Sequence, residues 1–267
     1  MQASGNLTDL QIAAMFTLPL TPPPTVATIS LVTPVLTPPV AVLVALPGLG
    51  GTAQSFPVSA FQDLVDAGVA VYFADYCQQI DSIAAMAHGV WTAILGAGID
   101  QEVFLLGYSM GGFVAQSMYM QAPSRVAGLI LLCTACLTLE DVVSTLLGGT
   151  HTIAIRSFIN GTRPHDIPAA GIVSEEMFQR ELSAIVAHVI SNVCQFVNTV
   201  ENCPVLSVYG SADKVVSVQS MEKLRQLALR TTFDEYVFPE AGHDLIYTQP
   251  GALGALLAQW VLRNSAQ

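Results

Sequence analysis

A serine set among small residues is the feature of the sequence best suited to chemistry. Residues 107–111 have the sequence G-Y-S-M-G, and Gly112 follows. An apolar stretch, 103–106, comes directly before them and a helical stretch directly after, so the spacing predicts a sharp strand–turn–helix connection. Small residues in such a turn let neighbouring backbone approach closely. The turn would expose the hydroxyl of Ser109 as a nucleophile at the carboxyl edge of a sheet.

A serine hydroxyl needs a base, and His243 is the best-placed candidate. It lies in a G-H-D sequence after a predicted strand, 232–238, and before the last predicted helix. Asp213 is the first carboxylate after the predicted strand 205–208, and it would hold the tautomer of His243 and stabilise the imidazolium. Glu140 is the alternative acid. Surface or packing roles are expected for the other histidines, His88, His151, His165 and His188.

Acyl transfer to a serine also needs two N–H donors for the oxyanion that forms. The N–H of Met110 is one candidate, because it lies at the start of the helix that follows Ser109. The second donor should come from the glycine-rich loop 47–51, P-G-L-G-G, which follows the predicted strand 40–46. We expect the N–H of Leu49 to fill this role. The alternative is a glycine turn without a catalytic part.

The elements that must position these residues alternate between strands and helices. The predicted strands at 69–74, 103–106 and 128–133 are apolar without alternation, which indicates helices on both faces. The pattern of strands resumes at 205–208 and 232–238. The predicted helices lie at 55–67, 80–97, 112–120, 218–229 and 252–263. The pattern predicts an α/β fold with a mainly parallel sheet. Strands at 26–32 and 40–46, joined by a proline-containing turn, are expected to form a hairpin.

Residues 137–200 interrupt this alternation and look largely helical. We therefore expect an α/β core formed by 1–136 and 201–267, with 137–200 inserted as a helical cap, or lid. Apolar residues with a 3.6-residue period predict a helix face here that packs on the core, and part of it could also roof a substrate pocket. The residues of this stripe are Ile185, Val186, Val189, Ile190, Val193, Phe196, Val197 and Val200.

Composition limits the classes of partner. The net charge is −11, which argues against nucleic acid, since that affinity comes mostly from Lys and Arg. Only 11% of residues are charged, yet prolines or polar residues interrupt each long uncharged run, so no integral membrane segment is expected. No basic segment followed by an apolar one opens the chain, so a cytoplasmic protein with reduced thiols is expected. A small-molecule acyl substrate is the expected partner, and the sequence does not indicate an oligomeric state.

No metal or organic cofactor is expected. Cys133 and Cys136 form a C-x-x-C sequence, but no second pair completes a zinc site. The pair also does not open a helix, as redox motifs do. Both cysteines are expected to be core residues at a strand end.

Taken together, these residues resemble the α/β-hydrolase superfamily, over nearly the whole chain. The stretch 129–135, L-I-L-L-C-T-A, is similar to the capped esterase and enol-lactonase group. The resemblance implies a Ser109–His243–Asp213 triad and an oxyanion hole formed by Leu49 and Met110. One departure is visible at Pro47, where such proteins usually carry histidine. Members that use aspartate as the nucleophile are set aside, because this chain has serine there.

The resemblance implies a serine hydrolase with an acyl-enzyme intermediate. The scarcity of Lys and Arg and the apolar cap favour a small or medium, mostly uncharged ester or lactone as substrate. Acyltransferases, lyases and haloperoxidases of the same superfamily share the triad, so they remain alternatives. So does a non-catalytic protein that binds a ligand on the hydrolase scaffold.

Overall fold

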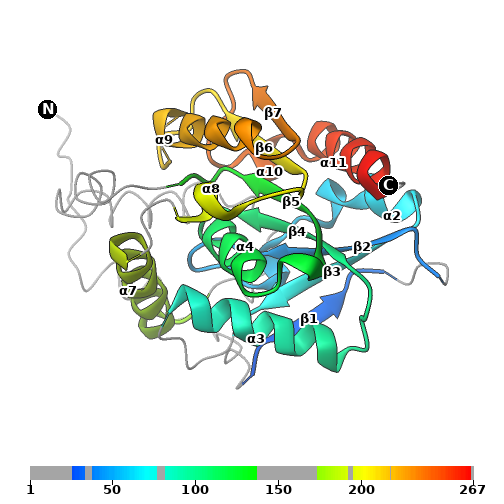
Figure 1. Ribbon diagram of the computed structural model, residues 1–267, viewed down its shortest axis with the longest axis horizontal. Helices are drawn as coiled ribbons and strands as arrows, with labels where there is room; N and C mark the ends of the chain where they lie inside the picture. The colour runs from blue at the N-terminus through cyan, green and yellow to red at the C-terminus, as the bar shows by residue number, and fades with distance from the viewer. Residues whose placement is uncertain are drawn as a thin grey trace, which may run out of the picture.

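A seven-stranded sheet forms the centre of the protein in the computed structural model (Figure 1). The structure describes residues 26–33, 38–76, 82–136, 173–191, 195–216 and 218–265. The strand order is β1-β3-β2-β4-β5-β6-β7, and every neighbouring pair except β1–β3 is parallel. The strands are β1 (Thr28–Leu31), β2 (Ala41–Leu46), β3 (Val69–Asp75), β4 (Val103–Tyr108), β5 (Val126–Leu132), β6 (Val205–Gly210) and β7 (Phe233–Phe238). The expectation of an α/β fold with a mainly parallel sheet is confirmed.

The predicted hairpin between the first two strands is wrong. β1 pairs antiparallel with β3, with Thr28 opposite Asp75, while β2 lies between β3 and β4. The burial of the two strands explains this arrangement. All six residues of β2 are buried, as suits a central strand, whereas β1 is half-buried or exposed and suits an edge.

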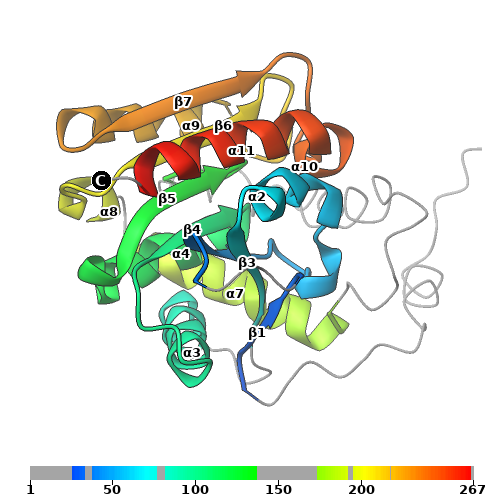
Figure 2. The ribbon, with the colours of Figure 1, turned by 90° about the vertical axis from the view of Figure 1, so that its right-hand side faces the viewer.

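Helices cover both faces of the sheet (Figure 2). α3 (Ile83–Gly96) and α4 (Met110–Gln121) lie on one face, and α2 (Gln62–Asp66) and α11 (Pro250–Ser265) on the other. The predicted helix at 55–67 is instead split into η1 (Ala53–Ser55), η2 (Val58–Ala60) and α2. The remaining short elements are η3 (Pro123–Arg125), α9 (Val218–Glu222), η5 (Lys223–Leu229) and α10 (Leu245–Thr248).

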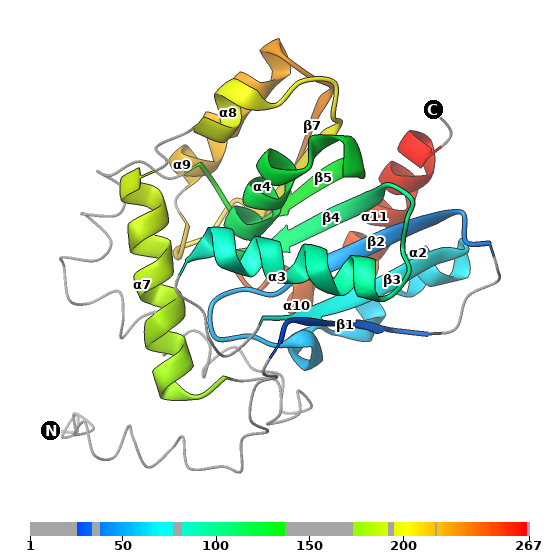
Figure 3. The same ribbon diagram turned by 60° about the horizontal axis from the view of Figure 1, so that its bottom comes forward.

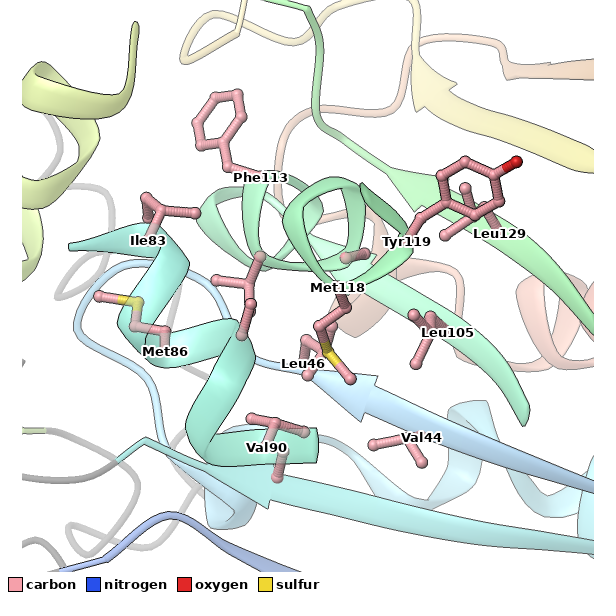
Figure 4. Close-up of a cluster of buried hydrophobic side chains, with 14 of the residues drawn as sticks. Val44, Leu46, Ile83, Met86, Val90, Leu105, Phe113, Met118, Tyr119 and Leu129 are labelled. Carbon is pink, nitrogen blue, oxygen red and sulfur yellow. The ribbon is translucent and has the colours of Figure 1, made fainter. Parts of the chain in front are cut away.

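Successive side chains of the central strands point to opposite faces of the sheet and pack in two separate hydrophobic cores. Val44, Leu46 and Leu105 pack under α3 and α4, where Met118 also lies (Figure 4). Their chain neighbours, such as Phe104, pack on the opposite face with α11. Truncating a fully buried leucine at such a position typically costs about 2–5 kcal/mol, so these contacts contribute strongly to the stability of the sheet whose carboxyl ends carry the loops.

In the described part of the segment between β5 and β6, where the cap was predicted, the structure has two helices. They are α7 (Glu175–Ser191), which runs past one end of α3, and α8 (Gln195–Thr199), which contacts α4 (Figure 3). Residues 137–172 of the predicted cap lie outside the described residues. Assignment of 137–200 as a cap stays a prediction.

The buried face of α7 begins earlier than the apolar stripe suggested. Met177, Phe178, Glu181 and Ala184 are buried, whereas Ile185 is only half-buried. The described part of the stripe lies on α7, which ends at Ser191, on α8, which begins at Gln195, and at Val200 directly after α8. From its later part, Phe196, Val197 and Val200 are buried.

Among the described helices, none combines the length and the apolar character that a membrane crossing needs. Cys133, Cys136 and Cys203 are buried thiols, as expected for core residues. Cys77 and Cys194 lie outside the described residues.

Candidate active site

Ser109 occupies a strained turn between β4 and α4. Its φ is 54° and its ψ is −118°, in the region of positive φ that side-chain-bearing residues rarely adopt. Hydrogen bonds on both sides hold the turn: Ser109 N–H donates to Leu132 O at 2.9 Å, and Gly112 N–H donates to Ser109 O at 2.9 Å. The predicted strand–turn–helix connection is therefore present, with the serine at its apex.

The close approach of neighbouring backbone requires a small residue at position 111 of the turn. A Cβ at this position would overlap the backbone of Leu46 and Pro47, at the end of β2 and the start of the loop that follows it. The first turn of α4 thus lies directly against that loop. A larger residue would push the two segments apart.

His243 reaches the serine from the loop between β7 and α10. Its Nε2 lies 2.9 Å from the Oγ of Ser109. Tyr108 holds this loop in place. Its hydroxyl donates to the backbone oxygen of His243 at 2.9 Å, and the centroids of the Tyr108 and His243 rings are 5.4 Å apart. The residue directly before the serine therefore holds the backbone of His243, a contact that no local sequence pattern indicates.

Asp213 lies on the other side of the imidazole. Its Oδ2 is 2.8 Å from the Nδ1 of His243, and both side chains are buried. Its other oxygen, Oδ1, accepts from the N–H groups of Val215 and Val216 at 2.8 and 3.0 Å. The Asp213 loop is tied to the His243 loop by Ala212 N–H, which donates to Ala241 O at 2.9 Å. The carboxylate is thus fixed in orientation as well as position.

The predicted oxyanion donors lie in the two segments that flank Ser109. Met110 is the first residue of α4. In the other segment, a Cβ placed on Gly48 would lie 3.1 Å from the Cβ of Ser109, so the loop that carries Leu49 passes close to the nucleophile. Tyr76, just after β3, anchors this loop by donating from its hydroxyl to Pro47 O at 3.0 Å.

Cys133 is an unforeseen neighbour of the histidine–aspartate pair. Its sulfur lies within 4.8 Å of ligand atoms of Asp213 and His243, a group that could in principle hold a metal ion. Burial, followed by the nearby charge of Asp213, raises the pKa of this thiol well above its usual range. A metal would need the thiolate and a ring nitrogen of His243, but both ring nitrogens already lie within hydrogen-bond distance of Asp213 and Ser109, so the geometry fits a hydrogen-bonded group better than a metal centre.

The two alternative residues that the structure describes, His88 and His188, do not join this group. His88 is exposed on α3. His188 lies on α7 with its ring 5.8 Å from that of Phe113, and burial lowers its pKa. The other three candidates, Glu140, His151 and His165, lie outside the described residues.

A family model identifies the class of protein. The model of the Hydrolase_4 family, described as "Serine aminopeptidase, S33", matches residues 37–249. The chain therefore belongs to this family of α/β hydrolases, and the resemblance to the α/β-hydrolase superfamily is confirmed. No curated protein sequence matches the chain.

Solved structures with the same fold include several enzymes. A thermophilic esterase from Thermogutta terrifontis has 18% sequence identity and a TM-score of 0.64, and the alignment covers 90% of this chain and 94% of that one. An esterase from Exiguobacterium antarcticum has 16% identity and a TM-score of 0.66, covering 91% and 99%. A monoacylglycerol lipase from Paleococcus ferrophilus has 17% identity and a TM-score of 0.63, covering 89% and 99%. These structures share the fold of this chain, which the family model places among the α/β hydrolases.

Proposed function

We propose that the protein is a serine hydrolase that cleaves small or medium, mostly uncharged carboxylic esters or lactones. One observation carries the proposal. A hydroxyl, an imidazole and a carboxylate from three distant segments form one chain, with 2.9 Å between Ser109 Oγ and His243 Nε2 and 2.8 Å between His243 Nδ1 and Asp213 Oδ2. This order of groups is the one that activates a serine for attack on a carbonyl carbon.

Acylation begins when the Oγ of Ser109 attacks the carbonyl carbon of the ester. In the tautomer that donates from Nδ1 to Asp213, the Nε2 of His243 accepts the hydroxyl proton. The buried carboxylate stabilises the resulting imidazolium. The N–H groups of Leu49 and Met110 are the proposed donors to the oxygen that becomes negative. As the tetrahedral intermediate collapses, His243 gives its proton to the departing alcohol and an ester on Ser109 remains.

Deacylation repeats these steps with water as the nucleophile. His243 removes a proton from the water, which attacks the carbonyl carbon of the acyl-enzyme. The second tetrahedral intermediate collapses with return of the proton to the Oγ of Ser109. Acid is released and the hydroxyl is restored.

Charge and burial favour an uncharged substrate. The chain has nine Lys and Arg residues in all, against 20 Asp and Glu, so an anionic substrate would meet an unfavourable field. In the proposed cap, 137–200, most buried side chains of the described part are apolar, namely Val173, Met177, Phe178, Ala184, Phe196, Val197 and Val200. They pack into the same core as α3 and α4, and we propose that apolar side chains of this segment also face an aliphatic or aromatic acyl group.

The test is hydrolysis of a series of p-nitrophenyl esters of increasing chain length. Wild-type protein should cleave the shorter members, and Ser109→Ala should lose at least about a thousandfold in kcat, with an unchanged Tm. Ser117→Ala, which removes a buried serine hydroxyl from α4 itself, is the matched control and should stay active. Labelling by a fluorophosphonate should depend on Ser109 alone. Turnover that survives in Ser109→Ala would reject the proposal.

The description of the matching family favours a second candidate, cleavage of an amino-terminal peptide bond. The same serine, histidine and aspartate would act on an amide. Comparing kcat/KM for aminoacyl p-nitroanilides with that for p-nitrophenyl esters separates the two. A competing alcohol, added to the ester assay, reveals acyl transfer by the ester it forms.

A further inference from the structure

A buried carboxyl group from α7 is bound to the loop that carries the proposed oxyanion donor. Glu181 has none of its surface exposed, although nothing in the proposed mechanism uses it. Its Oε2 accepts from the N–H of Gly50 at 2.7 Å, across 131 residues of sequence. Within the described part of the chain, its Oε1 has no hydrogen-bond partner. A buried acid with one unsatisfied oxygen is costly, so its presence calls for a reason beyond packing.

Gly50 is the central residue of a tight turn. Gly51 N–H donates to Gly48 O at 3.0 Å, and Gly50 has a φ of 75°, as a type II turn requires at this position. The backbone oxygen of Gly50 accepts from the N–H of Val173 at 3.1 Å. The segment between β5 and β6 therefore holds both polar backbone groups of Gly50.

The residue between Gly48 and Gly50 is Leu49, whose N–H is a proposed oxyanion donor. Gly48 lies against Ser109, so this turn connects the nucleophile to the residue bound by Glu181. The N–H of Gly50 belongs to the central peptide of the turn, whose orientation distinguishes type I from type II turns. The hydrogen bond to Glu181 stabilises one of these orientations.

We propose that Glu181 is a positioning residue for the oxyanion hole, whose carboxyl group holds the 48–51 turn in the conformation that aims the Leu49 N–H at the developing oxyanion. This inference rests on the proposed function. In this role, Glu181 links the segment between β5 and β6 to catalysis through the backbone of the 48–51 turn, and Glu181 itself does not contact the substrate. A donor must lie about 2.7–3.1 Å from the oxyanion, so a small displacement of the turn weakens it.

Protonation supports this role. Burial raises the pKa of Glu181 to about 8, against a smaller opposing effect of the hydrogen bond from Gly50. At neutral pH the group is therefore mostly a neutral acid that still accepts a hydrogen bond. A neutral Glu181 carboxyl group places no fixed negative charge next to the site where the oxyanion forms.

Three variants test the proposal in the full-length enzyme with a p-nitrophenyl ester as substrate. Glu181→Met removes the acceptor but keeps a side chain of similar length, and Glu181→Gln restores a neutral acceptor. Met177→Ala, a buried position on the same helix, is the control for general loosening of α7. The readouts are kcat, KM, and the inhibition constant of a trifluoromethyl ketone, which forms a tetrahedral adduct with an active serine.

Glu181→Met should lower kcat about tenfold to a hundredfold, since it weakens one donor without deleting it, and should leave KM within about threefold. Its affinity for the trifluoromethyl ketone should fall by a similar factor. Glu181→Gln should recover most of both losses. Met177→Ala should lose less than Glu181→Met in kcat at an equal or greater loss of Tm.

Two results would overturn the inference. One is a Glu181→Met enzyme that loses no more kcat than Met177→Ala. The other is a loss that appears in KM alone or that glutamine does not recover, since a merely structural carboxyl would behave so. Ser109→Ala in the same assay keeps the two proposals apart. Activity that survives in that variant rejects the serine mechanism, whereas activity lost there and unchanged in Glu181→Met rejects only the positioning role.

Discussion

Replacing Glu181 with glutamine should make the stability of the protein less dependent on pH. In the folded state burial raises the pKa of this carboxyl from 4.5 to about 8. In the unfolded chain the group is in water, so it loses its proton near its usual pKa. Between these two values the folded protein holds a proton that the unfolded chain has released. Stability is therefore fully present below about pH 4.5 and is lost as the pH rises through the folded pKa of about 8.

The size of the effect follows from these two pKa values. Each pH unit over which one proton separates the folded from the unfolded state changes the free energy of unfolding by about 1.4 kcal/mol. Between about pH 5 and pH 7 the wild-type protein should lose about 2.5 kcal/mol because of Glu181 alone. Glutamine does not titrate, so the variant should lack this loss.

Urea unfolding of both proteins at pH 5, 6 and 7, at constant ionic strength, measures the difference. The quantity of interest is the stability of Glu181→Gln minus that of the wild type, which should rise steadily with pH. Other buried groups contribute equally to both proteins and cancel. The half-buried Asp75 also cancels in this way, although partial burial raises its pKa against a hydrogen bond from Ala53 N–H.

Parallel stability curves for the two proteins would refute the reasoning. They would mean that Glu181 keeps its usual pKa in the folded state, hence that it is solvated rather than buried against Gly50. A difference in the free energy of unfolding that stays constant with pH would not support the reasoning, because it reports only the exchange of a carboxyl oxygen for an amide nitrogen. Only the slope reports the proton.

Three further outcomes are expected. Asp213→Asn should lower kcat about 10³–10⁴-fold in the ester assay while the fold stays intact, because an amide no longer favours the tautomer of His243 that can accept the serine proton. Gly111→Ala should unfold at a clearly lower urea concentration and lose ester cleavage, because the added Cβ overlaps the backbone at Leu46; an active variant of normal stability would contradict this. Cys133 should resist iodoacetamide in the native enzyme and react after denaturation, because burial raises its thiol pKa, and mass spectrometry of the alkylated protein checks the site.

Much of the candidate site could be found from local pattern alone. Ser109 is flanked by an apolar strand, a small-residue turn and a helix, all within about twenty residues. Asp213 and His243 each follow a strand directly, so the rule that parallel strands end at one edge of a sheet was enough to expect them together. The order of the first strands and helices was predictable for a different reason, because burial on both faces of a strand leaves a continuous apolar run.

Other features of the molecule depend on which distant segments meet. Local pattern favoured a hairpin between the first two strands, but β3 is the partner of β1, since the fully buried β2 is flanked by two other strands. The apolar stripe predicted in the cap missed Glu181, because a glutamate in the sequence breaks the hydrophobic period even where its side chain is buried.

The sequence by itself determined the fold class, the family and the segments that carry the hydroxyl, the imidazole and the carboxylate, because periodicity and turn chemistry act over a few residues. Only the tertiary structure decided that Tyr108 holds the backbone of His243, that Cys133 lies beside it, and that Glu181 binds Gly50. These contacts join residues far apart in the chain. They result from the packing of the whole fold, which no local pattern encodes.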